Sequence, residues 1–323
     1  MSKVTGIDIS KQTFDVSFLK ENGKWEHNVY HNNKTGFMKL WEETGKDFTF
    51  VMEASGPYYM KLADFLHSKK AFVSVVNPLV IRRYSQMKML RAKTDKKDAQ
   101  TIASYGMSQD LKQWNPSSDA IYMLQQIDTL IGGYQKQLTM LNNQLGAFTS
   151  TGKMPSSVKE SIAKTIENLN EEVKKLEAES KKIAEEGYKE TMELLQSIPG
   201  IGVKTAIMLI VITDNFTKFE NYKQLIAYIG FSPRIYQSGT SVKGKGHISK
   251  MGNPKARKML YMCSWVAKKY NKQAIEMYER LKQVGKPEKV IKVAIANKLI
   301  KQVFAIANSG QKYNADFAST RPV

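Results

Sequence analysis

Hydrophobic and polar positions in the first third of the chain alternate in short runs, a pattern that predicts strands separated by helices. Asn22-Gly23 is typical of a hairpin turn, and apolar side chains at helical spacing predict helices at 35–44 and from near Pro57. Three early strands followed by alternating helix and strand give the order of a ribonuclease H-like fold. The predicted strands are 4–8, 13–18, 24–31, 48–53 and 72–76.

From about residue 119 to 186 the spacing changes to steps of three and four, which is typical of a coiled coil. A segment rich in turn residues, 149–155, separates two such seams and favours an antiparallel helical hairpin; pairing between chains is the alternative. Such a hairpin could be a spacer, a dimerisation arm or a structural insertion. The seams are Leu124, Ile127, Ile131, Tyr134, Leu138, Leu141, Leu145 and Phe148, then Ile162, Ile166, Leu169, Val173 and Leu176.

A third segment, mainly helical, follows Gly187. Its run Pro199-Gly200-Ile201-Gly202 joins an apolar helix to one that begins near Lys204, as in a helix-hairpin-helix. Glycines there would let the backbone approach a DNA phosphate without reading base sequence. A simple turn between packed helices is the other interpretation. We therefore expect three domains, at 1–110, 111–190 and 191–323.

The charge of the chain predicts a polyanionic partner. Its 323 residues include 49 Lys and Arg against 30 Asp and Glu, a formal charge of +19, which favours nucleic acid. No apolar run approaches the roughly 18 to 20 residues of a membrane-spanning helix, and no signal-peptide core opens the sequence, so we expect a cytoplasmic protein. The single cysteine, Cys263, excludes an internal disulfide and a cysteine-based zinc site, and its apolar surroundings predict core packing.

Four carboxylates stand where metal ligands could lie. Asp8 and Glu53 each close an apolar strand, and Asp95 and Asp98 lie one helical turn apart. Magnesium is a hard cation that prefers oxygen ligands from a few carboxylates, water and phosphate. A DxxD pair alone is more often a solvated helix face. An ionised Asp8 at the end of an apolar strand is costly unless it is paired or bound to a metal.

A glycine-rich basic stretch, 230–254, has the composition of a loop that lies against phosphates. It contains Ser238 and His247, which by spacing alone are ordinary turn residues. The basic residues predicted to contact nucleic acid, in this stretch and beside it, are Lys204, Arg234, Lys243, Lys245, Lys250, Lys255, Arg257 and Lys258.

These motifs together resemble the IS110 family of insertion-sequence transposases over almost the whole chain. The runs 6–11, 52–58 and 93–99 resemble the DEDD signature of that family. The C-terminal half agrees independently in order and spacing. Its matching motifs are Pro199-Gly200-Ile201-Gly202, Gly230-Phe231-Ser232-Pro233, Gln237-Ser238-Gly239 and Ile248-Ser249-Lys250-Met251-Gly252-Asn253.

The resemblance implies an N-terminal domain similar to RuvC-type Holliday-junction resolvases, a coiled coil and a C-terminal transposase domain. It implies that Asp8, Glu53, Asp95 and Asp98 bind Mg²⁺ and that Ser238 attacks a DNA phosphate. Donor and target DNA would be cut and rejoined through a phosphoserine, guided by a structured bridge RNA. The resemblance also implies a dimer or tetramer in the bacterial cytoplasm, associated with the nucleoid when active.

Several alternatives remain open at this point. Ser241 and Ser249 are rival nucleophiles near Ser238. The chain could instead be a hydrolytic junction resolvase that uses activated water, a nucleic-acid-binding protein without catalysis, or a sugar-kinase or actin-like ATPase. The recombinase hypothesis requires the acids and Ser238 to act at one phosphate, either within one chain or between protomers.

Overall fold

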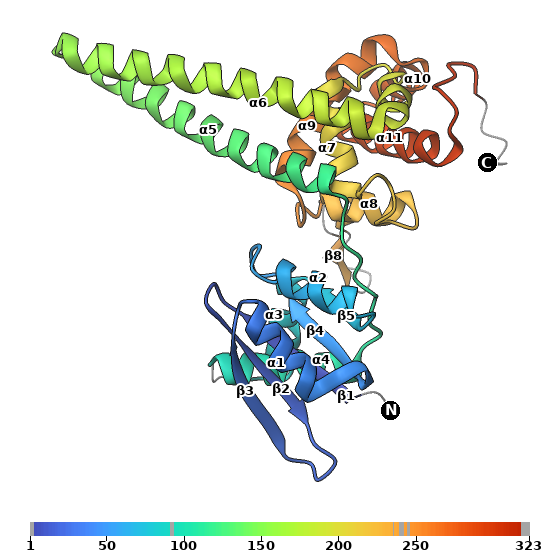
Figure 1. Ribbon diagram of the computed structural model, residues 1–323. Coiled ribbons are helices and arrows are strands. Elements are labelled where there is room, and N and C mark those ends of the chain that lie inside the picture. The colour runs from blue at the N-terminus through green and yellow to red at the C-terminus, as the bar shows by residue number, and fades with distance from the viewer. Residues whose placement is uncertain (1–2, 91–93, 235, 239–241, 244–245, 318–323) are drawn as a thin grey trace. The chain divides into compact units, whose positions relative to one another are not determined.

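The computed structural model describes residues 3–90, 94–234, 236–238, 242–243 and 246–317. The chain divides into two compact units, Met1–Pro116 and Ser117–Val323, each of which is described here by itself. Figure 1 shows a sheet in the N-terminal unit, and mainly helices in the C-terminal unit. The predicted combination of a mixed α/β region and a mainly helical region is confirmed.

The N-terminal unit is built on a five-stranded sheet with the order β3-β2-β1-β4-β5. The first three strands are antiparallel neighbours, and β4 and β5 continue the sheet in parallel with β1. All five predicted strands are confirmed within about one residue at their ends. The strands are β1 (Lys3–Ile9), β2 (Thr13–Leu19), β3 (Trp25–His31), β4 (Phe48–Glu53) and β5 (Phe72–Val76).

Two helices cover one face of this sheet. Helix α1 (Lys34–Thr44) leads through the short turn η1 (Gly45–Asp47) into β4, and α2 (Met60–Ser68) precedes β5. The core between these helices and the sheet contains Phe14, Phe50, Met52, Leu40 and Leu62, none of which is more than marginally exposed. The prediction of a helix from near Pro57 is wrong by three residues, because 56–59 form a turn before α2 begins.

Helices α3 (Pro78–Met87) and α4 (Asp95–Ser108) pack together, and α4 packs across the sheet on β1, β2 and β4. Val51, Val76 and Ile81 are buried there with Ile102 of α4 in a smaller core. The sheet is therefore covered on both faces, as its parallel strands require.

The C-terminal unit begins with a long helical hairpin. Helices α5 (Asp119–Ser150) and α6 (Ser156–Gln196) lie side by side, joined by a turn in which Gly152 has a φ of 67° (Figure 1). The predicted hairpin within one chain is thus present; coiled-coil winding of the two helices stays a prediction. Helix α6 bends at Tyr188, where φ is −142°, and then continues into the helical core.

The rest of this unit is a helical cluster around α11. Its helices are α7 (Val203–Thr213), α8 (Tyr222–Ile229), α9 (Pro254–Tyr270), α10 (Lys272–Gln283) and α11 (Glu288–Ser309). Cys263 is buried in this core, as predicted, and its Sγ lies 3.2 Å from Thr205 Oγ1. Within the parts of the chain that the structure covers, none of the helices is both long and apolar enough to cross a membrane.

Candidate active site

Asp8 and Glu53 lie side by side at the carboxyl ends of two parallel strands. The register of β1 and β4 pairs Gly6 with Val51 and Ile7 with Met52, so the next residues along the strands are Asp8 and Glu53. Because side chains alternate between the two faces of a strand, both carboxylates point to the face that α4 covers. The opposite face holds the apolar core of α1 and α2.

The close packing of α4 on β1 brings the other two acids to this place. A Cβ atom built at Gly6 would lie 2.2 Å from both the Ala99 carbonyl oxygen and the Ala103 amide nitrogen. At the other end of the contact, a Cβ at Gly106 would lie 2.7 Å from Val4 Cγ1. Helix α4 therefore runs in the opposite direction to β1, and the end of β1 that carries Asp8 lies toward the first turn of α4.

That first turn of α4 carries Asp95 and Asp98. Thr94 caps the helix, accepting a hydrogen bond from the Lys97 backbone N–H at 3.2 Å. Carboxylates are favoured near a helix N-terminus, where the unpaired N–H groups present partial positive charge. The helix thus presents both carboxylates beside Asp8 from a position fixed by backbone contact.

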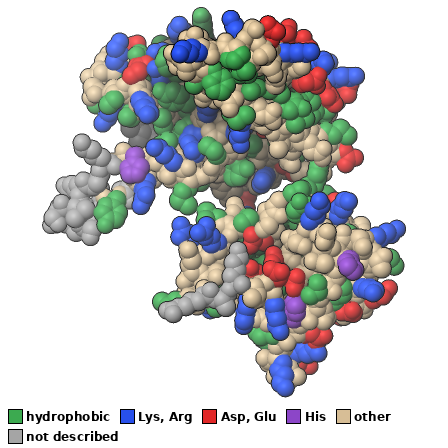
Figure 2. Space-filling model, turned by 90° about the vertical axis from the view of Figure 1, so that its left-hand side faces the viewer, with side chains coloured by type: hydrophobic (Ala, Val, Ile, Leu, Met, Phe, Trp, Pro, Cys, Tyr) green, Lys and Arg blue, Asp and Glu red, His purple; other side chains and the backbone are tan. Residues whose placement is uncertain are grey.

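The pKa of Asp8 reflects both its burial and the three other acids around it. Burial, followed by the charges of Asp98, Glu53 and Asp95, raises the pKa of Asp8 from 3.8 to about 6. Glu53 accepts a hydrogen bond from Ser55 Oγ at 2.5 Å, which holds its side chain. Figure 2 shows acidic side chains gathered on the visible face of the N-terminal unit, with Lys and Arg side chains around them.

A fifth acid, Asp15, faces the same site and was missed by sequence reasoning. It pairs with Asp8 across β1 and β2, contributes the smallest part of the rise in the pKa of Asp8, and lies 2.7 Å from His27 Nε2. The alternation of β2 could have placed Asp15 on this face. Its partner on β3 could be found only from the register.

The donor set suits a hard divalent cation, although the side chains do not converge on one point. Among the residues that the structure covers, no three His, Cys, Asp or Glu side chains are arranged to hold a metal ion. Repulsion between carboxylates acts over longer distances than metal coordination, so the raised pKa of Asp8 and the open arrangement are compatible. Asp8, whose charged form is disfavoured by burial and by the neighbouring acids, is chemically matched to Mg²⁺, which would relieve that cost.

Ser238 lies in the C-terminal unit on a short antiparallel ribbon. Strand β7 (Gln237–Ser238) pairs with β8 (Val242–Lys243), with Ser238 opposite Val242 and Gln237 opposite Lys243. A second pair, β6 (Pro233–Arg234) and β9 (His247–Ile248), sets Arg234 opposite His247. The rival nucleophile Ser241 and the predicted phosphate contact Lys245 lie outside the described residues.

Two interlocking turns support the base of this ribbon. Gly230 has a φ of 86°, and a Cβ there would lie 2.5 Å from the Met251 carbonyl oxygen. Gly252 has a φ of 130°, and a Cβ there would lie 2.1 Å from the Tyr228 carbonyl oxygen. Both glycines therefore permit close backbone packing between the two motifs, and contact of this loop with phosphates stays a prediction.

Arg257, predicted to contact nucleic acid, forms a hydrogen bond within these turns. Its guanidinium donates a hydrogen bond to the Ile229 carbonyl oxygen at 2.7 Å. Lys250 is exposed, has a φ of 57°, and donates its backbone N–H to the Gly230 carbonyl oxygen at 3.1 Å. Lys258 and Arg234 are also exposed.

Two other predicted phosphate contacts form ion pairs inside the unit. Lys204 Nζ lies 2.5 Å from Glu177 Oε1 on α6, and Lys255 Nζ lies 2.5 Å from Asp128 Oδ1 on α5. Gly200, in the predicted helix-hairpin-helix turn, has a φ of 109° and lies against α9, where a Cβ would be 3.0 Å from Ala267 Cβ. A role of these residues in nucleic-acid binding stays a prediction.

Comparison with known proteins decides the family. A DEDD-type transposase family model matches residues 5–150, and a second model, described as transposase of the IS116/IS110/IS902 family, matches residues 192–279. The chain is 31% identical to the pilin gene-inverting protein of Moraxella lacunata, an alignment that spans 97% of this chain and 98% of that protein. The chain belongs to the IS110 family of transposases.

Two further relatives align over shorter stretches. A protein of insertion element IS110 from Streptomyces coelicolor is 26% identical over 54% of this chain and 42% of its own length. The transposase of element IS1111A from Coxiella burnetii is 29% identical over 45% of this chain and 40% of its own length. This transposase is accordingly a DNA-acting enzyme, and both the acid cluster and the ribbon that carries Ser238 fall within the two matched regions.

Proposed function

We propose that this transposase cuts and rejoins donor and target DNA through a phosphoserine intermediate. In this proposal Asp8, Glu53, Asp95 and Asp98 hold Mg²⁺, and Ser238 is the nucleophile. The observation that carries the proposal is the gathering of carboxylates from β1, β4 and α4 around a half-buried Asp8 whose pKa is raised to about 6. Ion pairing would lower that pKa, whereas burial and, after it, the charges of the neighbouring acids raise it.

The sheet order supports a RuvC or ribonuclease H-like fold for the N-terminal unit. Three antiparallel strands followed by two parallel ones, with acids at the ends of β1 and β4, are the arrangement expected of that fold. A helix that crosses the sheet then supplies the remaining acids. This geometry places oxygen ligands on rigid elements, which a catalytic site requires.

The chemistry assigned to the chain's own residues is a pair of balanced phosphoryl transfers. Bound Mg²⁺ would supply Lewis-acid activation of the scissile phosphate and of the attacking hydroxyl. Ser238 Oγ forms a bond to phosphorus as it loses its proton, and the bond from phosphorus to a deoxyribose oxygen breaks, with that oxygen taking up a proton. In rejoining, a deoxyribose hydroxyl of another strand attacks the phosphoserine, and Ser238 leaves with a proton.

Basic residues near the serine are suited to stabilise this reaction. Arg234, Lys243, Lys245 and Lys250 surround Ser238 in the sequence and would offset charge that builds on the phosphate oxygens. An active serine needs such help, because its hydroxyl is a weak nucleophile at neutral pH.

Relatives named for gene inversion favour rejoining over simple hydrolysis. The Moraxella proteins are named as pilin gene-inverting, and an inverted gene must be joined again at both ends. Because the alignments span almost the complete chains, the same outcome is proposed for this protein. A phosphoserine would conserve the energy of the cut bond for that second step.

The guide RNA and the oligomer are the parts of the proposal that rest on family resemblance. A formal charge of +19 is compatible with a protein that holds a bridge RNA and two DNA duplexes. Sequencing the nucleic acid that co-purifies with the protein from its native locus is expected to give one discrete RNA; a mixture without such a species would remove RNA guidance from the proposal.

A dimer or tetramer in which protomers share the reaction is tested by mixing variants. Asp8→Asn and Ser238→Ala are each expected to be inactive alone. If acids and serine of different protomers cooperate, the mixture regains activity in mixed oligomers. Failure of the mixture, with mixed oligomers shown to form, would assign both halves of the reaction to one chain.

The function itself is tested by sequencing joined DNA ends. A plasmid that carries the native element with its flanks, expressed with the wild-type protein, is expected to yield new junctions. Asp8→Asn and Ser238→Ala should yield none, whereas the exposed-acid control Asp47→Asn should match the wild type. Broken DNA without junctions from the wild type would contradict the proposal.

Hydrolysis is the second candidate, and the acid cluster favours it because four carboxylates with Mg²⁺ suffice to activate water. In that case the chain would act like a Holliday-junction resolvase, with Ser238 as a phosphate contact only. Ser238→Ala would then keep most of its cutting activity, whereas Asp8→Asn would lose it.

A further inference from the structure

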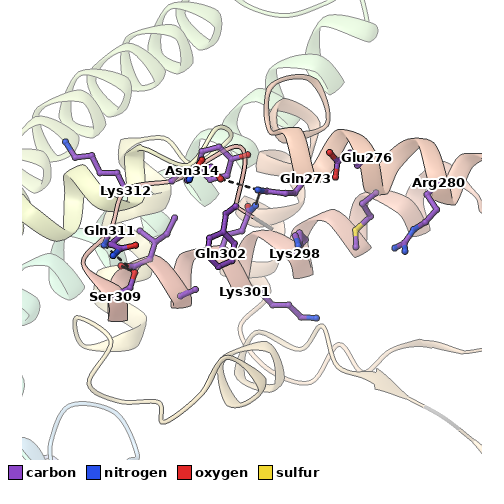
Figure 3. A pocket seen from close by; sticks show the side chains of 15 residues that line it. Gln273, Glu276, Arg280, Lys298, Lys301, Gln302, Ser309, Gln311, Lys312 and Asn314 are labelled. Atoms are coloured by element: carbon purple, nitrogen blue, oxygen red, sulfur yellow. Dashed lines mark hydrogen bonds between the residues drawn. The ribbon is translucent and has the colours of Figure 1, made fainter. Parts of the chain in front are cut away.

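A groove in the C-terminal unit is lined by residues to which no part of the reaction is assigned. It is bounded by α10, α11 and the segment 310–317 that follows α11, and its volume is about 770 Å³. That size falls within the range of about 300–1,000 Å³ for ligand sites in proteins. Figure 3 shows side chains from both helices and from the terminal segment lining it.

Hydrogen bonds between amide side chains hold the walls of the groove in place. Gln302 Nε2 donates to Gln273 Oε1 at 2.6 Å, and Gln273 Nε2 donates to the backbone oxygens of Asn314 and Ala315 at 3.2 Å (Figure 3). Behind them the buried Asn271 accepts a hydrogen bond from the Tyr313 hydroxyl at 3.2 Å. The terminal segment is thus fixed to α10, and the groove is a built feature of the fold.

Apolar and aromatic side chains form part of the lining. Met277 and Tyr313 are half-buried, and Ile306 is buried. Phe317 is 69% exposed, although burial of an aromatic ring is favourable. An exposed ring beside a half-buried one offers faces on which a flat, unpaired base can stack.

The charged residues of the groove are four cations and one acid: Arg280, Lys298, Lys301, Lys312 and Glu276. Lys312 is held only loosely, 3.5 Å from Glu193, and Lys301 lies over the Tyr222 ring at 5.4 Å. Neither Arg280 nor Lys298 forms an ion pair with a residue that the structure places. Lys204 and Lys255, in contrast, are matched to acids at 2.5 Å. The excess positive charge therefore calls for an anionic occupant.

We propose that this groove binds an unpaired strand of DNA. Phosphates would lie on Arg280 and Lys298, and a base would stack against Tyr313 or Phe317, the combination that single-strand-binding proteins use. The choice of DNA rests on the proposed function, because strands that are cut and exchanged are unpaired before they are rejoined. A duplex keeps its bases stacked inside and would leave the aromatic faces without a partner.

The test measures binding of single strands to the full-length protein in the Asp8→Asn background, so that no strand is cut. Fluorescence anisotropy with a labelled oligo(dT) of about 12 nucleotides, a typical site size, is recorded over a range of salt concentrations. Arg280→Gln with Lys298→Gln is expected to weaken binding about tenfold and to reduce the salt slope by about 1.4, or about 0.7 for each lost phosphate contact. The matched control is Lys159→Gln with Lys164→Gln, two exposed lysines on α6 that carry the same charge change.

Equal losses in the two variant pairs would overturn the proposal, because the effect would then come from total charge. Tighter binding of oligo(rU) or of duplex DNA than of oligo(dT) in this groove would overturn the choice of occupant. Melting temperatures show whether the variants fold.

Photocrosslinking with 5-iododeoxyuridine in the oligonucleotide avoids groove variants altogether. Crosslinks are expected in peptides of α10, α11 or 310–317, and crosslinks found only elsewhere would contradict the proposal. Because neither assay involves cutting, failure here leaves the proposed reaction untouched, and failure of the reaction leaves the binding result standing.

Discussion

The acid cluster and the serine ribbon are fixed in the fold by very different amounts of structure. The acids stand on a five-stranded sheet and on a helix pressed against it at Gly6, where no side chain separates the two backbones. Ser238 stands on a strand of two residues, paired with another of two residues. Gly230 and Gly252 pack closely against backbone carbonyl oxygens at the base of this ribbon.

The difference shows which half of the proposed reaction is preorganised. Ligands on strand ends and on a helix N-terminus keep their positions because moving them would break a core. Two strands of two residues share few ladder hydrogen bonds, so we expect the position of the ribbon to depend on the turns at its base. We therefore expect substitutions at the two sets of glycines to affect the protein in different ways.

The largest effect is expected from Gly6→Ala. The new methyl group would meet the backbone of Ala99 and Ala103, so α4 must move and carry Asp95 and Asp98 with it. Overpacking of this kind costs about 1–3 kcal/mol and more where backbone is the obstacle. Urea unfolding should show that loss together with loss of recombination. The control Gly133→Ala, in open space on α5, should be neutral or stabilising.

A smaller and more local loss is expected from Gly252→Ala. The positive φ and the Tyr228 carbonyl oxygen both oppose a Cβ atom, at a cost of about 1–3 kcal/mol. Because the acids are untouched, the rise in melting temperature on adding Mg²⁺ should remain while strand joining is lost. Loss of the Mg²⁺ response would show that the turn at Gly252 and the four acids do not act independently in metal binding.

Next in size is the pH dependence of stability that Asp8 confers. Its pKa is raised from 3.8 to about 6 in the folded chain, so the folded state holds the proton more tightly than the unfolded state. The contribution of Asp8 is therefore fully present below pH 3.8 and is lost as the pH rises through about 6. Relative to Asp8→Asn, the wild type should lose about 1–2 kcal/mol over this window, after allowance for partial exposure.

Urea titrations at a series of pH values, with EDTA or with Mg²⁺, measure this difference. Mg²⁺ should reduce the loss at neutral pH by compensating the charge of Asp8. Stability curves of wild type and Asp8→Asn that run parallel from pH 4 to 7 would contradict the raised pKa of Asp8.

The smallest effect is expected from Lys204→Gln. Its ion pair with Glu177 is exposed on the lysine side, and such pairs contribute about 0.2–1 kcal/mol. If Lys204 also contacts a phosphate, the salt dependence of duplex DNA binding should fall by about 0.9 in slope. Lys175→Gln, which breaks the exposed pair with Glu172, is the control. An unchanged slope would mean that Lys204 does not contact a phosphate and only joins α7 to α6 through its ion pair.

The sequence predicted the strands and the positions of the acids well, because alternation and helical spacing are local properties. It missed the contact of Gly6 with α4, although a glycine inside a strand is a known sign of close backbone approach. It also missed Asp15 with His27, which meet only through the register of β2 and β3.

The C-terminal half shows the limit of local patterns more clearly. Lys255 and Arg257 were grouped by charge as phosphate contacts, yet they reach Asp128 and the Ile229 carbonyl oxygen. Gly230 and Gly252, in the loop predicted to lie against phosphates, also pack closely between turns. Nothing in the spacing distinguishes these uses, since each depends on what the fold places opposite. The preference for Ser238 over Ser241 and Ser249 likewise rests on family resemblance.

The most direct test of the account is to trap the protein on cut DNA and map the attachment by mass spectrometry. The full-length protein is incubated with DNA, Mg²⁺ and any RNA that co-purifies with it, then quenched in denaturant and digested with protease and nuclease. We predict a nucleotide phosphate on Ser238 in the wild type and none in Asp8→Asn or Ser238→Ala. An adduct on Ser241 or Ser249, or cut strands with no adduct, would contradict the account.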